Sequence, residues 1–235
     1  MTTENKHLSN IELYYCSSLT ENEQIFQLGD EEYHHATKVM RNKVGDSLYA
    51  TDGNGQIYEG IITSIEKKSI RVRVLKFNIL QNRLKHFTFC IPNLRNPDRF
   101  KFALEKCTEL GITNFILFNS ERSVSKGFNL DRINKILLSA MKQSLQAYLP
   151  KVEVFDSVKR FKDLAVEKVL FEQNSESKFA NQKFDISKEY YFIFGPEGGL
   201  SQKEILNIQP TLILNLADNR LRSETAIIKV ASILS

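Results

Sequence analysis

The chain has 235 residues, of which 42% are hydrophobic and 26% charged, and its formal net charge is +4. These values are typical of a soluble globular protein with one or two domains, and no apolar run approaches the ~20 residues of a membrane-spanning helix. Residues 1–10 are polar and lack the apolar core of a signal peptide, so they are expected to form a flexible tail.

The cysteines and the distribution of charge further limit which class of protein this is. Cys16, Cys90 and Cys107 are odd in number, widely spaced and without a C-x-x-C pair, which predicts reduced thiols in a cytoplasmic protein and no metal site. Residues 1–80 contain nine Lys and Arg against eleven Asp and Glu, whereas residues 81–235 contain twenty-three against seventeen. A polyanion would therefore be attracted mainly to the second part.

Residues 1–80 contain several short strand patterns and one helix pattern, which together indicate a small β-barrel. Strands are expected at residues 11–16, 47–51, 56–62 and 69–74, and a helix at residues 31–41. The turn Asp52-Gly53-Asn54-Gly55 predicts a hairpin between the second and third of these strands.

From residue 81 onward, strand and helix patterns alternate, which indicates an α/β sheet. After a polar linker at 81–85, strands are expected at 87–91, 112–118, 151–155, 168–171, 190–194 and 211–216, and helices at 130–147, from Ser201 and at 226–234. Another helix begins at Asn96-Pro97-Asp98, with Asp98 as the expected cap and Gly111 as the stop. Residues 173–188 are polar and are expected to be mobile.

A glycine-rich loop, Gly195-Pro196-Glu197-Gly198-Gly199, follows the strand expected at 190–194. Ser201 and Glu204 have the spacing of a capping box, so a helix is expected to follow the loop. Open α/β sheets bind ligands at the carboxyl ends of their strands. A turn without a ligand is the alternative, and the loop matches neither a dinucleotide fingerprint nor a nucleotide-triphosphate loop.

A second loop follows the strand expected at 211–216 and carries the sequence Leu-Ala-Asp-Asn-Arg-Leu-Arg-Ser-Glu-Thr-Ala. It concentrates charged and polar side chains in a few residues. The helix expected at 226–234 is so apolar that it must be buried, either against its own domain or against a second subunit.

Together these stretches resemble the 16S ribosomal RNA (uracil-N3) methyltransferases, the RsmE type of the SPOUT superfamily. The matches are Gly195 to Gly199 for the family's GPEGG loop, and Leu216, Leu221, Arg222, Glu224, Thr225 and Ala226 for its second loop. Ala217 departs from the glycine usual in the family, which could narrow the pocket or alter the loop angles. Shorter matches at 34–55, 105–112, 120–124 and 139–144 follow in the family's order, so the resemblance covers residues 11–235.

The resemblance implies an α/β fold with a C-terminal trefoil-knot methyltransferase domain at 81–235 and a PUA-like β-barrel at 1–80. It also implies S-adenosylmethionine as the cofactor. The residues expected to surround it are Leu170, Phe171, Glu172, Gly195, Pro196, Glu197, Gly198, Gly199, Leu214, Asn215, Leu216, Asn219, Arg220 and Leu221.

The implied reaction is methyl transfer to N3 of a uridine in 16S RNA of the small ribosomal subunit. Uracil N3 must lose its proton, so a base or an anion-stabilising cation is needed. Arg222 is the candidate that holds the uridine and stabilises the developing anion, Glu224 is the candidate base, and Thr225 is expected to hydrogen-bond the base or the cofactor. Alternatively, Glu224 simply favours the helix dipole.

The family's PUA-like domain contacts ribosomal RNA, and its members usually form homodimers. The RNA-binding candidates are Lys38, Arg41, Lys43, Arg71, Arg73, Lys106, Arg122 and Lys142. Arg71 and Arg73 could instead coat the wet face of a sheet.

Two other functions remain open at this stage. One is methylation of another position, such as a ribose 2′-hydroxyl of ribosomal or transfer RNA. The other is RNA binding during ribosome assembly without catalysis, for which a pocket distorted by Ala217 is the support.

Overall fold

The computed structural model describes residues 11–19, 24–123 and 127–235. The expectations for residues 1–10 and for Val124 lie outside this part of the chain. The described residues form two compact units: one is the chain up to Asn82 together with Met141–Leu149, and the other is Arg83–Ala140 with Pro150–Ser235. Each unit is described by itself below.

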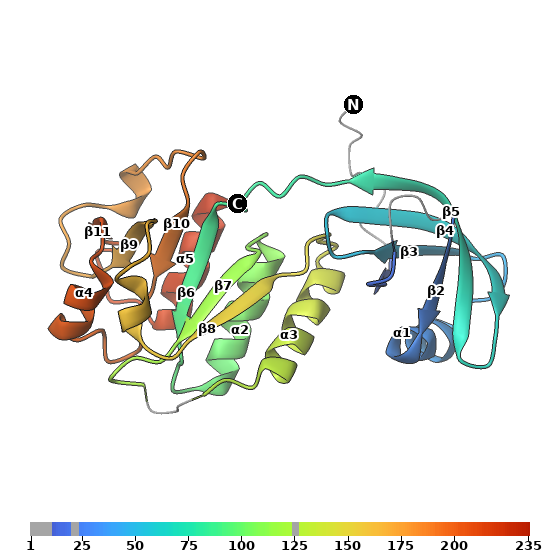
Figure 1. Ribbon diagram of the computed structural model, residues 1–235, viewed down its shortest axis with the longest axis horizontal. Helices are drawn as coiled ribbons and strands as arrows, with labels where there is room; N and C mark the ends of the chain where they lie inside the picture. The colour runs from blue at the N-terminus through green and yellow to red at the C-terminus, as the bar shows by residue number, and fades with distance from the viewer. Residues whose placement is uncertain (1–10, 20–23, 124–126) are drawn as a thin grey trace. The chain divides into compact units, whose positions relative to one another are not determined.

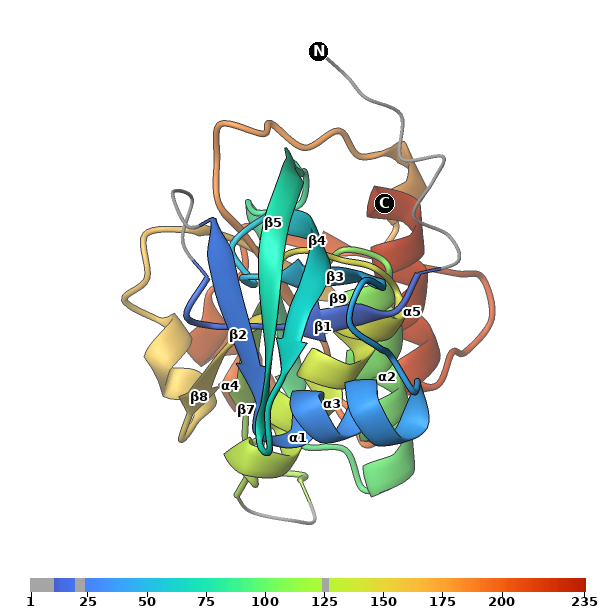
Figure 2. The same ribbon diagram turned by 90° about the vertical axis from the view of Figure 1, so that its right-hand side faces the viewer.

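The first unit is built on a five-stranded sheet in the order β1-β3-β4-β5-β2 (Figure 2). Its strands are β1 (Leu13–Tyr15), β2 (Ile25–Gly29), β3 (Ser47–Thr51), β4 (Gln56–Ile65) and β5 (Ser69–Ile79). β1 runs parallel to β3, and the other neighbours are antiparallel. The predicted hairpin joins β3 to β4, and Gly53 and Gly55 adopt φ values of 75° and 109° that glycine tolerates.

The sequence analysis did not predict β2, because only Phe26 and Leu28 of its five residues are buried apolar side chains. Its strand conformation depends on antiparallel pairing with β5. The helix expected at 31–41 begins as α1 (Asp30–His34) and continues as a turn of π-helix at His35–Val39. It ends before Arg41, whose φ is 58°.

The segment Met141–Leu149 belongs to the first unit through specific contacts. The carbonyl oxygen of Ala147 accepts hydrogen bonds from Gly55 N at 2.9 Å and Thr51 Oγ1 at 3.3 Å. The Tyr148 hydroxyl donates to the Leu80 carbonyl at 2.8 Å. The division expected at residue 80 therefore describes the first unit without this returning segment.

The second unit contains a six-stranded sheet in the order β11-β9-β10-β6-β7-β8 (Figure 1). All its pairings are parallel. The strands are β6 (Phe87–Pro92), β7 (Asn114–Phe118), β8 (Lys151–Phe155), β9 (Glu167–Phe171), β10 (Tyr190–Ile193) and β11 (Leu212–Leu214). Each strand expected from the sequence is present, and the last is shorter than the predicted 211–216.

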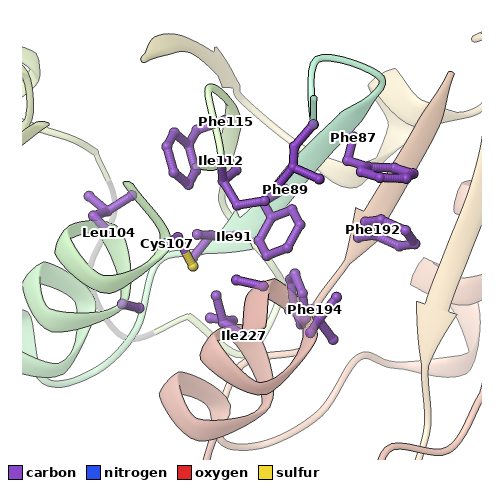
Figure 3. Close-up of a cluster of buried hydrophobic side chains, with 14 of the residues drawn as sticks. Phe87, Phe89, Ile91, Leu104, Cys107, Ile112, Phe115, Phe192, Phe194 and Ile227 are labelled. Atoms are coloured by element: carbon purple, nitrogen blue, oxygen red, sulfur yellow. The ribbon is translucent and has the colours of Figure 1, made fainter. Parts of the chain in front are cut away.

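Both faces of this sheet are buried, as in parallel sheets generally. Phe89 and Ile91 of β6 face a cluster that includes residues of α2 (Pro97–Glu109), α3 (Leu130–Gln143) and α5 (Ser223–Leu234). Figure 3 shows Phe89, Phe192 and Phe194 packed near Ile227 of α5 and Cys107 of α2. Cys90 faces the opposite cluster, which contains residues of the 3₁₀ turn Val158–Phe161 and of α4 (Gln202–Ile208).

Several helix ends differ from the predictions: α3 ends at Gln143 rather than at residue 147, and α5 begins at Ser223 rather than at residue 226. The cap of α2 is Asn96, whose Oδ1 accepts from Asp98 N at 2.8 Å and Arg99 N at 3.3 Å, so the prediction of Asp98 as the cap was wrong. Asn96 is the cap because the helix begins at Pro97, before Asp98, and proline is favoured at the first helical position. The capping box of Ser201 and Glu204 is confirmed.

Cys16, Cys90 and Cys107 are free and buried. Burial raises the pKa of both the Cys90 and the Cys107 thiol above its ordinary range. Among the described residues, no helix has the length and apolar character needed to cross a membrane, and no His, Cys, Asp and Glu side chains cluster as metal ligands.

Candidate functional site

A cavity of ≈ 660 Å³ lies at the carboxyl ends of β9, β10 and β11. Its size falls in the range of small-molecule sites, roughly 300–1,000 Å³. The glycine-rich loop after β10 and the second loop after β11 form most of the cavity wall. The lining residues are Phe171, Glu172, Gln173, Asn174, Phe194, Gly195, Pro196, Glu197, Gly198, Gly199, Asn215, Leu216, Ala217, Asn219, Arg220, Leu221, Arg222, Ser223 and Ala226.

The first loop is held in a tight turn that exposes its backbone to the cavity. Gly199 N donates to the Pro196 carbonyl at 2.8 Å, and Gly199 has a φ of 68°, which favours glycine. The Glu197 carboxylate accepts from the backbone N–H of Arg95, with Oε1 at 3.2 Å. The strand–helix connection before α2 is thereby fixed to the loop.

The segment at 120–123 supports the same loop from another side. Arg122 donates from its guanidinium to the carbonyl oxygen of Gly198. Glu204 is 1% exposed, and its two carboxylate oxygens accept from Glu121 N and Ser201 N, each at 2.8 Å. Ser201 in turn donates its hydroxyl to Glu121 at 2.8 Å. The glycine loop and the start of α4 are therefore anchored by charge-assisted hydrogen bonds, which are stronger than neutral ones.

The second loop is ordered mainly by Asn215. Its Oδ1 accepts from Ala217 N at 2.7 Å, and its backbone N–H donates to the Ser177 carbonyl at 2.7 Å. Ser223 then donates its hydroxyl to the Gly195 carbonyl at 3.0 Å, which joins the second loop to the first. Ala217 does not have a left-handed backbone conformation, unlike several other described residues, so the loop does not require glycine at position 217.

Charges of both signs surround the cavity. Glu172 and Glu197 supply carboxylates, and Arg220 and Arg222 supply guanidinium groups. Burial raises the pKa of Glu172 above its ordinary value. The site can therefore bind a ligand that carries both a cationic and an anionic group beside an apolar portion.

Comparison with known proteins identifies the family. A family model described as the RNA methyltransferase domain matches residues 82–235. The chain belongs to the RNA methyltransferase family. A second model, the RNA methyltransferase PUA domain, matches residues 28–75.

Three relatives illustrate how far the similarity extends. The chain is 28% identical over 228 residues to ribosomal RNA small subunit methyltransferase E of Bacillus subtilis, covering 89% of each chain. A crystal structure of a probable rRNA-methyltransferase from Porphyromonas gingivalis is 26% identical, with a TM-score of 0.83 and coverage of 94% of this chain and 96% of that one. A ribosomal RNA small subunit methyltransferase E from Neisseria gonorrhoeae, solved bound to S-adenosyl methionine, has the same fold at 23% identity, a TM-score of 0.84 and coverage of 94% and 95%.

Most residues expected to surround the cofactor of this RNA methyltransferase line the cavity. Leu170 and Leu214 do not, since they are 0% and 1% exposed and pack in the core instead. The sequence analysis missed Gln173, Asn174, Phe194, Ser223 and Ala226 as cofactor-site residues, whereas Ala217, which it had placed at the pocket, does line the cavity. Gln173 and Asn174 directly follow β9, and the rule that places ligands at the carboxyl ends of strands would have found them.

The three catalytic candidates lie in different surroundings. Arg222 lines the cavity as the residue that caps α5. Glu224 is 8% exposed and lies outside the lining, with its Oε1 3.5 Å from Nε of Arg99. Thr225 is exposed and also lies outside the lining.

The RNA-binding candidates divide into exposed and paired side chains. Lys38, Arg41, Lys43 and Arg73 are exposed. Several of the others contact protein groups. Arg71 pairs with Glu66 at 3.1 Å, Lys106 with Glu109 at 2.8 Å, Arg122 with the Gly198 carbonyl, and Lys142 with Glu32 at 2.6 Å.

Proposed function

We propose that this protein transfers a methyl group from S-adenosylmethionine to N3 of a uridine in the 16S RNA of the small ribosomal subunit. The observation that carries the proposal is the cavity at the carboxyl edge of the parallel sheet, closed by two loops that Ser223 and Gly195 join. The names of the ribosomal RNA small subunit relatives support the RNA substrate.

The cavity residues fit the proposed cofactor by their chemistry. Leu216, Leu221 and Phe171 offer apolar surface for an adenine ring, and backbone groups of the glycine loop offer hydrogen bonds. Glu172 and Glu197 offer carboxylates to its cationic groups, and Arg220 offers a partner for its carboxylate. When bound, S-adenosylmethionine would supply an electrophilic methyl group on a sulfonium.

The residues of the chain then have to orient the uracil and manage its N3 proton. N3 lies on the pairing edge, so the target base must be unpaired or flipped out of a helix. Arg222 reaches the cavity with a fixed positive charge, which would stabilise the anion formed as the N3 proton leaves. We assign this role to Arg222 because the other two candidates lie outside the lining.

The first unit is proposed to hold the RNA outside the reaction centre. Lys38, Arg41 and Lys43 are exposed beside the end of the π-turn, and Arg73 is exposed on β5. We assign this RNA-binding role to residues 1–80 and catalysis to residues 81–235, in a cytoplasmic protein. Replacing Lys38, Arg41 and Lys43 together with alanine should weaken binding to small subunits without altering cofactor affinity.

A homodimer is proposed through the second unit. α5 buries Ile227, Val230 and Ala231 in its own core but leaves Ile233 48% exposed. Sedimentation velocity tests this, because an Ile233→Asp variant should lower the dimer fraction. Wild-type protein that sediments as a monomer at all concentrations would refute it.

The decisive experiment is primer extension on 16S RNA after unmethylated small subunits are incubated with the protein and S-adenosylmethionine. Methylation at N3 blocks base pairing, so reverse transcriptase should stop beside one uridine. Gly195→Trp is the matched control. A Cβ at Gly195 meets only ordinary contacts, the nearest 3.6 Å away, so the fold should tolerate the change while the indole fills the cavity.

Each result has a distinct meaning. A single cofactor-dependent stop that disappears in Gly195→Trp and in Arg222→Ala supports the reaction and the role of Arg222. Cofactor binding without a stop would reject N3 as the target and favour a ribose position. Absence of both cofactor binding and a stop would favour RNA binding without catalysis.

A further inference from the structure

Two arginines near the start of α2 contact residues at or next to the cavity wall, and they have no role in the function proposed above. Arg95 is exposed, and its backbone N–H is fixed to Glu197, which lines the cavity. Arg99 lies in the first turn of α2, with Nε 3.5 Å from Oε1 of Glu224. Glu224 directly follows Ser223, another lining residue. Arg95 is therefore bonded through its backbone to a lining residue, and Arg99 contacts the sequence neighbour of another.

Arg95 and Arg99 differ in how their side chains are held. No ion pair or hydrogen bond of the Arg95 guanidinium is found among the described residues, so it can turn towards a ligand. The Arg99 side chain is 36% exposed, and its contact with Glu224 is longer than the 2.7–2.9 Å typical of charge-assisted hydrogen bonds. Most of its five N–H donors therefore stay available.

Glu224 is placed to hold Arg99 rather than to receive a proton from a substrate. Its side chain is 11% exposed, and its Oε2 is buried without a hydrogen-bond partner in the described residues. A buried carboxylate needs a counter-charge, and Arg99 supplies it across the α2–α5 contact. A general base must come within hydrogen-bond reach of the proton that it removes, yet Glu224 does not line the cavity.

We propose that Arg95 and Arg99 bind RNA phosphates flanking the target nucleotide and that Glu224 is a positioning residue for Arg99. This inference rests on the proposed RNA methyltransferase function. Arginine suits the task because its planar fork binds phosphate oxygens in pairs and stays charged at all relevant pH values. Phosphate contacts fix the register of a nucleic acid on a protein without reading its sequence. The two arginines thus set how the strand enters the cavity.

The first test measures RNA affinity against salt concentration for Arg95→Ala and Arg99→Ala. Each lost phosphate contact should reduce the slope of log K against log salt by about 0.7–0.9. Arg160→Ala removes an equal charge from the second unit at a site away from the cavity, where Arg160 bonds Glu153, and its slope should match the wild type. Cofactor affinity should be unchanged in all three variants. Unchanged slopes in both cavity variants would overturn the proposal.

The second test separates positioning from proton transfer at Glu224. Glu224→Gln should weaken the contact that positions Arg99, so KM for the small subunit should rise about three- to tenfold while kcat stays within about threefold of wild type. The pH profile of kcat should not move, and Glu224→Gln should add nothing to Arg99→Ala because both act through one contact. A kcat loss of about 100-fold or more with an altered pH profile would instead make Glu224 the base.

The outcomes also distinguish this inference from the proposed function. If the wild type makes no N3 stop but the slopes fall in both variants, the phosphate contacts stand and the reaction fails. If the wild type methylates and the slopes do not change, the reaction stands and the phosphate contacts fail. Arg99→Lys provides the conservative variant, which should keep part of the slope while losing the paired geometry of the guanidinium.

Discussion

Ser223 donates its hydroxyl to the carbonyl oxygen of Gly195 at 3.0 Å, and this contact joins the two loops that form the cavity. The residues are far apart in sequence, and each follows a different strand of the sheet. The loop after β10 and the start of α5 therefore hold one another in the geometry that a ligand would meet.

Removing this contact should weaken cofactor binding. Ser223→Ala deletes one neutral hydrogen bond, worth about 1 kcal/mol, so Kd for S-adenosylmethionine should rise roughly fivefold. Isothermal titration calorimetry measures the change. Ser232→Ala, at an exposed position on the same helix, is the control and should leave Kd unchanged. Equal affinities for both variants would show that the loops hold their positions without the bond.

Glu204 should be a determinant of stability. Its carboxylate satisfies two backbone N–H groups, those of Glu121 and Ser201, and its replacement by alanine leaves both without that acceptor. Glu204→Ala should lower the free energy of unfolding by about 3 kcal/mol, as measured by urea denaturation. Lys203→Ala, whose side chain is 75% exposed on the same helix, should change it by less than about 0.5 kcal/mol. A loss below about 1 kcal/mol for Glu204→Ala would mean that water replaces the carboxylate.

Ala217 should be compatible with cofactor binding. The residue lines the cavity, its N–H is fixed by Asn215, and its backbone needs no left-handed conformation. Ala217→Gly mainly adds freedom to the unbound loop, at about 0.5–1 kcal/mol, so affinity for S-adenosylmethionine should fall no more than about fivefold. A gain of tenfold or more in Ala217→Gly would show that the methyl group obstructs the pocket.

Glu172 should make stability depend on pH in a defined direction. Burial raises its pKa in the folded protein, so folding favours the protonated form. The associated stability is present below the pKa of the unfolded chain and is lost as pH rises through the folded value. Glu172→Gln should therefore be more stable than wild type at pH 7, and the difference should shrink near pH 4. Thermal unfolding at both values tests this, and a difference that grows on acidification would contradict it.

Local patterns in the sequence predicted the elements that carry the site. The apolar run before Gly195, the spacing of Ser201 and Glu204, and the apolar helix after Ser223 each depend on interactions within a few residues. Such local interactions do not depend on contacts between distant parts of the chain. β2 lacked such a signal, since its strand conformation depends on pairing with β5.

The surroundings of the functional side chains also depend on tertiary structure, so the sequence predicted some of them wrongly. The family resemblance placed Leu170 and Leu214 beside the cofactor, but side chains alternate along a strand, and theirs point into the core. Lys142 was expected to contact RNA, yet it forms an ion pair with Glu32, which is distant in sequence.

The sequence by itself determined the alternation of strands and helices, because short-range periodicity encodes it. It also determined the two loops that line the cavity, and the motif residues in these loops carry the resemblance to a methyltransferase family. The tertiary structure alone decided that Arg99 meets Glu224, that Ser223 meets Gly195, and that Met141–Leu149 packs with the first unit. These contacts join residues from separate elements. Their existence depends on how the sheet and helices pack, which no local stretch of sequence specifies.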